Sequence, residues 1–72
     1  MRLLNVCPFK VGDVVYWEEE PDYHTKIIRI EMKAHYRMLF CWNERYRRED
    51  YWYVCSTDPN HSGIRLLKRG DE

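Results

Sequence analysis

The 72-residue sequence has no excess of charge of either sign, because twelve Lys and Arg residues balance twelve Asp and Glu residues. Proteins that capture nucleic acid without sequence preference attract its phosphates with a strongly positive surface. The balance argues against a protein of that class, although a local basic patch remains compatible with it. The sequence also lacks any run of about eighteen apolar residues, so we expect no membrane-spanning helix.

Cysteine is scarce, and the cysteines do not have the arrangement expected of a set of disulfides. Cys7, Cys41 and Cys55 are an odd number and form no CxxC motif, whereas small secreted domains carry an even disulfide framework. Asn5 and Pro8 interrupt the apolar start before it reaches the length of a signal peptide. We therefore expect a soluble cytoplasmic protein that begins at its natural start.

The residues that could bind a metal or perform catalysis are few and scattered. The spacing of the potential ligands matches neither zinc fingers nor zinc ribbons, and we expect no metal and no cofactor; these residues are Cys7, His24, His35, Cys41, Cys55 and His61. The sequence has no glycine-rich phosphate loop, no evident Cys–His nucleophile and no carboxylate cluster beyond 18–20, which is typical of a solvated loop. We predict that the chain is not an enzyme.

Aromatic residues, by contrast, are abundant: three Trp, six Tyr and two Phe. A chain of this length buries only about 60% of its unfolded surface, and each aromatic ring removes a large area from water. Most of these rings are therefore expected in the core of one domain over 1–72. Its core would span about 9–68, followed by a short polar tail.

The pattern of β-branched, aromatic and turn residues predicts five strands. They are expected at 13–17, 26–32, 37–42, 51–55 and 64–67. Strict alternation places Ile28, Ile30 and Met32 on one face of the second strand, and Met38, Phe40 and Trp42 on one face of the third. A helix over 31–40 is the competing interpretation.

Gly12 and Asp13 directly precede the first strand. Glycine adopts the positive φ that a tight turn needs, and the aspartate carboxylate can cap the same turn. Five short strands within about sixty residues fit a strongly bent antiparallel sheet that closes on itself and so removes its exposed edges. The fold class that we predict is all-β, a single five-stranded antiparallel barrel.

The segment VGDVVYW, residues 11–17, resembles the opening strand of SH3-like small barrels, notably the Tudor and PWWP branches. The turn-rich stretch before Ile64-Arg65-Leu66-Leu67 is similar to the way such barrels end, with a short turn or 3₁₀ segment before the last strand. The two matches cover under a third of the chain and imply an SH3-like barrel. The sequence lacks the ALYDY-type opening of signalling SH3 domains and the Pro-Trp-Trp-Pro-type motif, so the resemblance implies neither proline-rich nor histone ligands.

One stretch combines arginine with an aromatic residue: Arg45, Tyr46, Arg47 and Arg48. Arginine and aromatic side chains serve both in phosphate contact and in base stacking. Acidic neighbours at 44, 49 and 50 weaken the positive field. The stretch is compatible with a solvated hairpin loop, a protein contact or a nucleic-acid contact.

Neighbours such as Trp52 and Tyr53 must point to opposite faces of a strand, so at least one of them is exposed. We predict that Trp52 is the outward residue because it lies near the charged end of the preceding loop, residues 48–50. Exposed Trp and Tyr are typical of binding surfaces, although covering loops or an aromatic cage for a methylated ammonium are alternatives.

These features predict a non-enzymatic module that binds a protein partner through exposed aromatics and charged loops, with the alternative of a nucleic-acid-binding small barrel that uses 45–48. Homodimerisation through acidic-to-basic contacts is compatible with both. Chains of this size include small regulators and inhibitors of phages and mobile elements, and we expect a similar role. The predicted partner-binding residues are Trp17, Tyr23, Arg45, Tyr46, Arg47, Arg48 and Trp52.

Overall fold

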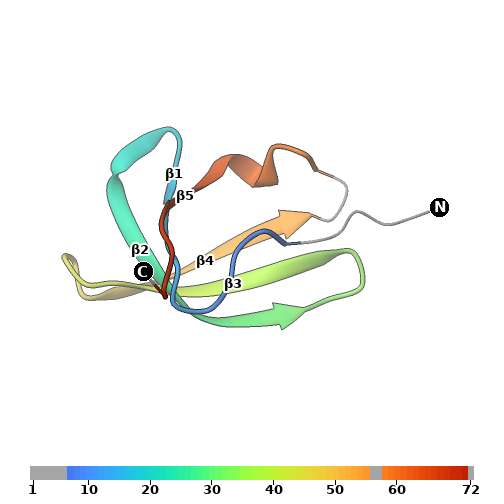
Figure 1. The fold of residues 1–72 in the computed structure, drawn as a ribbon, viewed down its shortest axis with the longest axis horizontal. Helices are drawn as coiled ribbons and strands as arrows, with labels where there is room; N and C mark the ends of the chain where they lie inside the picture. The colour runs from blue at the N-terminus through green and yellow to red at the C-terminus, as the bar shows by residue number, and fades with distance from the viewer. Residues whose placement is uncertain (1–6, 56–57, 72) are drawn as a thin grey trace.

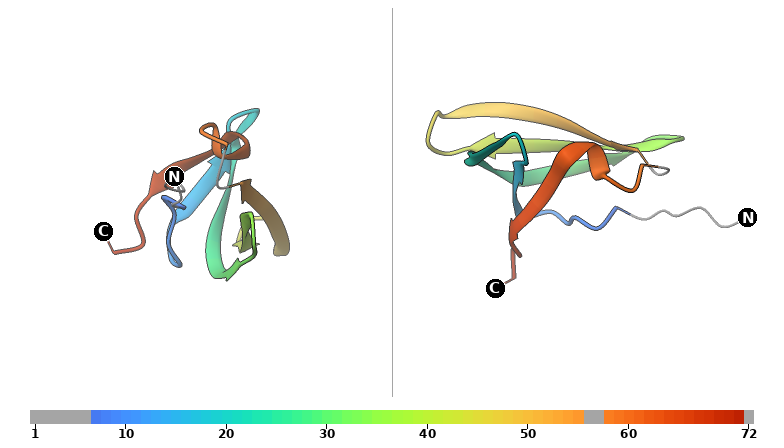
Figure 2. Two further views of the ribbon diagram at one scale, coloured as in Figure 1. Left: turned by 90° about the vertical axis from the view of Figure 1, so that its right-hand side faces the viewer. Right: turned by 90° about the horizontal axis from the view of Figure 1, so that it is seen from above.

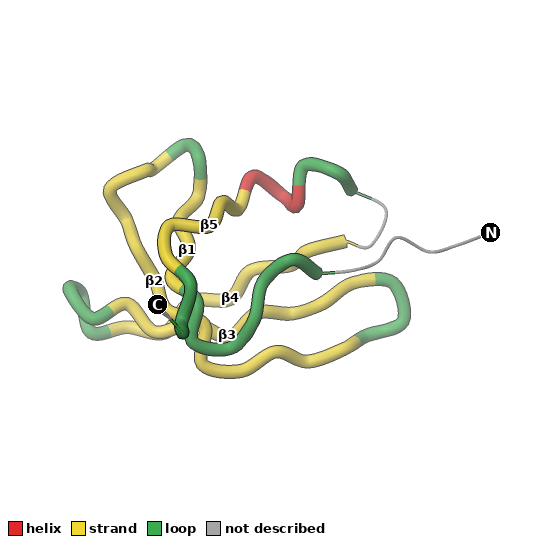
Figure 3. The backbone as a smooth tube through the Cα atoms, in the orientation of Figure 1, coloured by secondary structure: helices red, strands yellow, loops and turns green. Residues whose placement is uncertain are grey.

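A computed structural model describes residues 7–55 and 58–71. Its elements are five strands and one 3₁₀ turn (Figures 1 and 3): β1 (Val14–Trp17), β2 (Glu20–Met32), β3 (Tyr36–Asn43), β4 (Arg48–Cys55), η1 (His61–Gly63) and β5 (Ile64–Lys68). The five predicted strands are confirmed. The helix over 31–40 is wrong, because β2 and β3 occupy that stretch as a hairpin.

The five strands form one antiparallel sheet in the order β4-β3-β2-β1-β5. The long strand β2 makes this possible, because its residues 20–26 pair with β1 and its residues 26–32 pair with β3. Strands β2, β3 and β4 form one layer, and β5 with η1 lies across from it (Figure 2). The fold is all-β and its sheet is antiparallel, as predicted. It is not closed, since the described residues include no ladder between β4 and β5.

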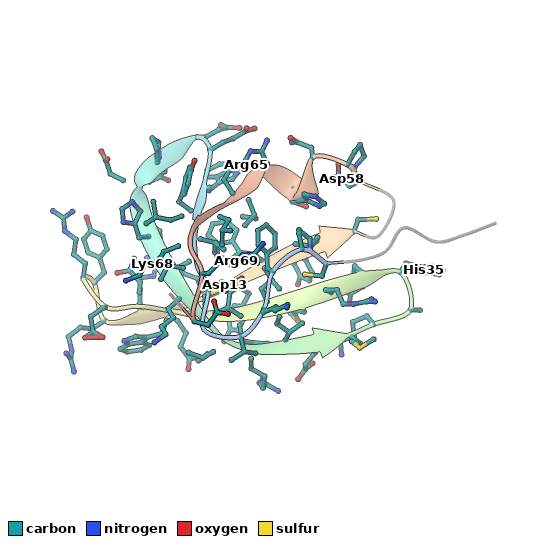
Figure 4. The ribbon with its side chains drawn as sticks, in the orientation of Figure 1. Asp13, His35, Asp58, Arg65, Lys68 and Arg69 are labelled. Atoms are coloured by element: carbon teal, nitrogen blue, oxygen red, sulfur yellow. The ribbon has the colours of Figure 1, made fainter. Side chains whose placement is uncertain are left out.

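The turn before β1 is built on the residues that the sequence marked. Gly12 has φ of 100°, and a carboxylate oxygen of Asp13 accepts a hydrogen bond from the Lys10 backbone N–H at 2.9 Å. The same carboxylate accepts the Gly70 N–H at 2.9 Å and Arg69 Nη1 at 3.1 Å. We call this set of contacts the Asp13 clasp (Figure 4). Residues 69 and 70, expected in a polar tail, are thus part of the fold.

The core lies between the β2–β4 layer and the segments that cross it. Its buried apolar residues are Phe9, Val15, Ile27, Leu39, Cys41, Val54 and Ile64. On β3 the buried positions are 39, 41 and 43, and the face that carries Met38, Phe40 and Trp42 is turned away from this core. On β2, Ile27 is fully buried, while Ile28 and Met32 are exposed.

A β-bulge explains why simple alternation fails on β2. The pairing passes from Ile27 opposite Cys41 directly to Arg29 opposite Phe40, so Ile28 is an extra residue. An extra residue reverses which positions face inward beyond it. The grouping of Ile28, Ile30 and Met32 on one face is therefore wrong for Ile28, whereas Ile30 and Met32 share the face of Leu39.

Candidate functional site

The turn between β3 and β4 is held in place from below by one buried side chain, Asn43. Its Nδ2 donates to the His24 carbonyl oxygen at 2.8 Å, and its Oδ1 accepts the Tyr46 N–H at 2.6 Å. Asn43 is 1% exposed, so neither hydrogen bond competes with bulk water. The side chain ties the turn to β2 and fixes its geometry.

Two tyrosines stack at this turn. The rings of Tyr23 and Tyr46 have centroids 5.6 Å apart and lie within 12° of parallel. The Tyr23 hydroxyl donates to Asp50 Oδ2 at 2.7 Å, and burial together with this acceptor raises the pKa of Tyr23 to about 12. The Arg45 guanidinium lies 5.4 Å from the centroid of the Tyr46 ring. We call Tyr23 with residues 44–48 the hairpin tip.

The charges of the hairpin tip largely cancel. Arg47 Nη1 lies 3.9 Å from Glu44 Oε2, and Arg48 Nε lies 3.6 Å from Asp50 Oδ1. In the part of the chain that the structure describes, Arg45 has no carboxylate within ion-pair distance. A hollow opens beside it, lined by Asp22, His24, Asn43, Glu44, Arg45 and Tyr46. Of the predicted binding residues, the structure brings together Tyr23, Arg45, Tyr46, Arg47 and Arg48.

Trp17 and Trp52 lie elsewhere, and the prediction that Trp52 points outward is wrong. The two indoles pack against the core with ring centroids 6.3 Å apart. Trp52 shares its face of β4 with the buried Val54, whereas Tyr51 and Tyr53 are 53% and 54% exposed. Trp17 and Trp52 therefore stabilise the fold and offer little surface to a partner.

A second exposed surface was not identified from the sequence. The side chains on the face of β3 and β4 that is turned away from the core form what we call the outer face: Tyr36, Met38, Phe40, Trp42, Tyr51 and Tyr53. Phe40 and Tyr51 meet edge to face at 5.2 Å, and Tyr36 and Tyr53 do so at 5.4 Å. The sequence did contain a signal for this surface: the aromatic residues at 36, 40 and 42, and those at 51 and 53, are separated by even numbers of residues and so share a face of their strand.

No group of three or more His, Cys, Asp and Glu side chains within residues 7–55 and 58–71 is placed to hold a metal ion. Burial raises the pKa of the Cys41 thiol to about 12, and burial also raises the pKa of Cys7. A nucleophilic cysteine needs the opposite shift. These two thiols pack as small apolar groups.

Removal of metal ions should leave the protein unchanged. Incubation with excess EDTA is expected to shift the melting temperature by less than about 1 °C, because the described residues bring no set of ligands together for an ion that would stabilise the fold. Differential scanning calorimetry measures this shift. A fall of many degrees that added zinc restores would contradict the absence of a structural ion.

None of the described segments is a helix long and apolar enough to cross a membrane. Comparisons with protein-family models, with curated proteins and with solved structures found no significant match.

Proposed function

We propose that this chain is a non-enzymatic interaction module, an SH3-like small barrel that binds a protein partner through the hairpin tip. The topology supports the fold assignment: β2 is shared between both halves of the sheet, and η1 directly precedes β5. The observation that carries the functional proposal is the rigid stack of Tyr23 and Tyr46 beside Arg45. Tyr46 is 56% exposed there.

Rigidity matters because association costs side-chain and loop entropy. The hydrogen bonds of Asn43 and the stacked rings order the hairpin tip before any partner arrives. Tyrosine and arginine are also the residue types that most often dominate binding energy. The hollow beside Tyr46 offers space for a partner side chain, and Arg45 offers a guanidinium for a carboxylate. The partner segment that fits presents one carboxylate to Arg45 and one side chain to the hollow.

The mixed charges favour a protein over a nucleic acid. Phosphate binding gains from uncompensated cations, because each phosphate neutralised releases counterions. Glu44 and Asp50 already neutralise Arg47 and Arg48. Stacking of a base on Tyr46 beside Arg45 is the feature that supports the nucleic-acid alternative. A small regulator or inhibitor would use such a site to occupy a partner's surface.

The double substitution Arg45→Ala/Tyr46→Ala should weaken partner binding about 30-fold or more, which corresponds to roughly 2 kcal/mol for a hot-spot pair. The partner is first captured from native lysate on the immobilised chain, with and without nuclease, and then titrated by calorimetry. The control variant is Met32→Ala/Lys33→Ala at the opposite hairpin, where both residues are exposed. It should bind like the unmodified chain.

The same titration against single- and double-stranded oligonucleotides at about 0.15 M salt separates the two ligand classes. Micromolar or tighter oligonucleotide binding that the double substitution abolishes would make the nucleic-acid alternative correct. Normal partner binding by a folded Arg45→Ala/Tyr46→Ala variant would show that the hairpin tip is not the binding site.

A further inference from the structure

The outer face is an apolar surface bordered by charged side chains along β2 and by Glu49 at one end of β4. Each cross-strand row of this surface has a residue from β2, one from β3 and one from β4. The ladders give the rows as Lys26, Trp42, Glu49; then Arg29, Phe40, Tyr51; then Glu31, Met38, Tyr53. Each row thus has a charged side chain at its β2 end and a carboxylate or a phenol at its β4 end.

This arrangement is self-complementary. We propose that the outer face binds the outer face of a second copy of this chain, about a two-fold axis that runs along β3. Such an axis places β2 of one copy over β4 of the other and keeps each row opposite its own counterpart. Two sheets that pack face to face in this way stay nearly aligned, about 30° apart, because of their twist. The proposal uses other residues than the hairpin tip and is independent of it.

Each row then acquires a favourable partner. Lys26 faces Glu49 of the second copy, and both side chains are exposed in the single chain. The Arg29 guanidinium, which lies 3.9 Å from the Phe40 ring centroid, faces the phenol of Tyr51, a cation–π acceptor. Glu31 faces the hydroxyl of Tyr53, which can donate to a carboxylate. The two-fold axis makes every one of these contacts twice.

The alternative two-fold axis, across the strands, would place β2 over β2 and bring Lys26 of one copy toward Lys33 of the other. It would also oppose Arg29 and Glu31, but these two side chains already form an ion pair within each chain, so the gain is smaller. The zero net charge of the chain leaves no long-range repulsion between copies. Charge therefore permits association and selects the axis along β3.

The size of the surface sets the expected affinity. Three strands spaced about 4.8 Å apart and four rows spaced about 6.8 Å apart, the fourth being the row of Tyr36, cover roughly 14 by 27 Å. Two such faces bury roughly 760 Å², which is less than the roughly 1,200 Å² of stable specific interfaces. The dimer should therefore be weak and form at submillimolar concentrations.

Complementary charge reversal tests the proposal. Lys26→Glu places a glutamate against Glu49 of the second copy, and Glu49→Lys places a lysine against Lys26. Each variant alone should dimerise at least 10-fold more weakly than the unmodified chain. An equimolar mixture of the two should recover the dimer, because both contacts are then between opposite charges. Sedimentation equilibrium and native mass spectrometry measure the association. Glu19→Lys, an exposed charge change in the β1–β2 turn, is the control and should leave it unchanged.

Urea titration of each variant verifies that it is folded, and Tyr53→Ser offers an uncharged second route that should also weaken the dimer. A chain that remains monomeric at 1 mM would overturn the proposal. So would single variants that dimerise normally, as edge-to-edge pairing of β4 would predict, or a mixture that fails to associate.

Discussion

Replacing Asp13 with alanine should lower the free energy of unfolding by about 2–4 kcal/mol. The carboxylate is 2% exposed and accepts hydrogen bonds from the Lys10 and Gly70 N–H groups and from Arg69. Its removal leaves the Lys10 and Gly70 N–H groups without their acceptor, whereas the Arg69 guanidinium, whose side chain is 40% exposed, stays hydrated. A chain of this length has a total stability of roughly 4–11 kcal/mol, so the substitution removes a large fraction of it. Urea unfolding at low, fixed protein concentration measures the change.

Asp71→Ala provides the matched control, since Asp71 is an exposed carboxylate beside the Asp13 clasp. It should change the stability by less than about 0.5 kcal/mol. Equal effects of the two substitutions would show that charge near the C-terminus, and not the buried contacts of Asp13, is responsible.

The same carboxylate gives the stability a defined pH dependence. Burial alone would raise the pKa of Asp13, but the Gly70 and Lys10 N–H groups and the Arg69 guanidinium outweigh it and lower the pKa. The unfolded chain has an aspartate pKa of about 3.9. The contribution of Asp13 is therefore fully present above that pH and is lost as the pH falls through the lower folded value. The Asp13→Ala variant should lack this part of the acid transition.

Replacing Leu39 with alanine should cost about 2–5 kcal/mol, because the side chain is fully buried on β3, a central strand of the sheet. The control is the adjacent Met38→Ala on the outer face, which should cost less than about 1.5 kcal/mol. Both variants remove a long aliphatic side chain from the same strand. The comparison therefore measures which face of β3 is the core.

Urea unfolding at low protein concentration, where the chain is monomeric, keeps association out of the measurement. A larger loss for Met38→Ala than for Leu39→Ala would mean that the register of β3 is reversed.

The positions of the strands could be predicted from the sequence, because turn residues and β-branched or aromatic runs alternate clearly. Gly12 and Asp13 were likewise identified as a turn, and both behave as expected. The faces of the strands could not be predicted in the same way. Leu39 and Cys41 are apolar, and so are Met38, Phe40 and Trp42, so alternation gives no sign of which set is buried. On β2 the extra residue Ile28 shifts the pattern within the strand.

The candidate site was predicted in part. Its arginines and Tyr46 are neighbours in the sequence, so their clustering follows from the hairpin alone. Asn43 was not singled out, because its two hydrogen bonds depend on the approach of β2 from 19 residues away. Trp52 was placed outward because of its charged neighbours, yet its inward direction depends on the register of β4. Contacts of this kind are tertiary and leave no local signal.

The Asp13 clasp also bears on how the chain folds and unfolds. Its hydrogen bonds join residues 56 and 57 positions apart, and closing a loop of that length costs about 3.6 kcal/mol of chain entropy, apart from a constant term. The hairpins β2–β3 and β3–β4 join near neighbours and close first. We expect the clasp to form late, and contacts that form after the transition state slow unfolding without speeding folding. On this hypothesis the clasp sets how long each molecule stays folded, while the hairpins set how quickly it folds.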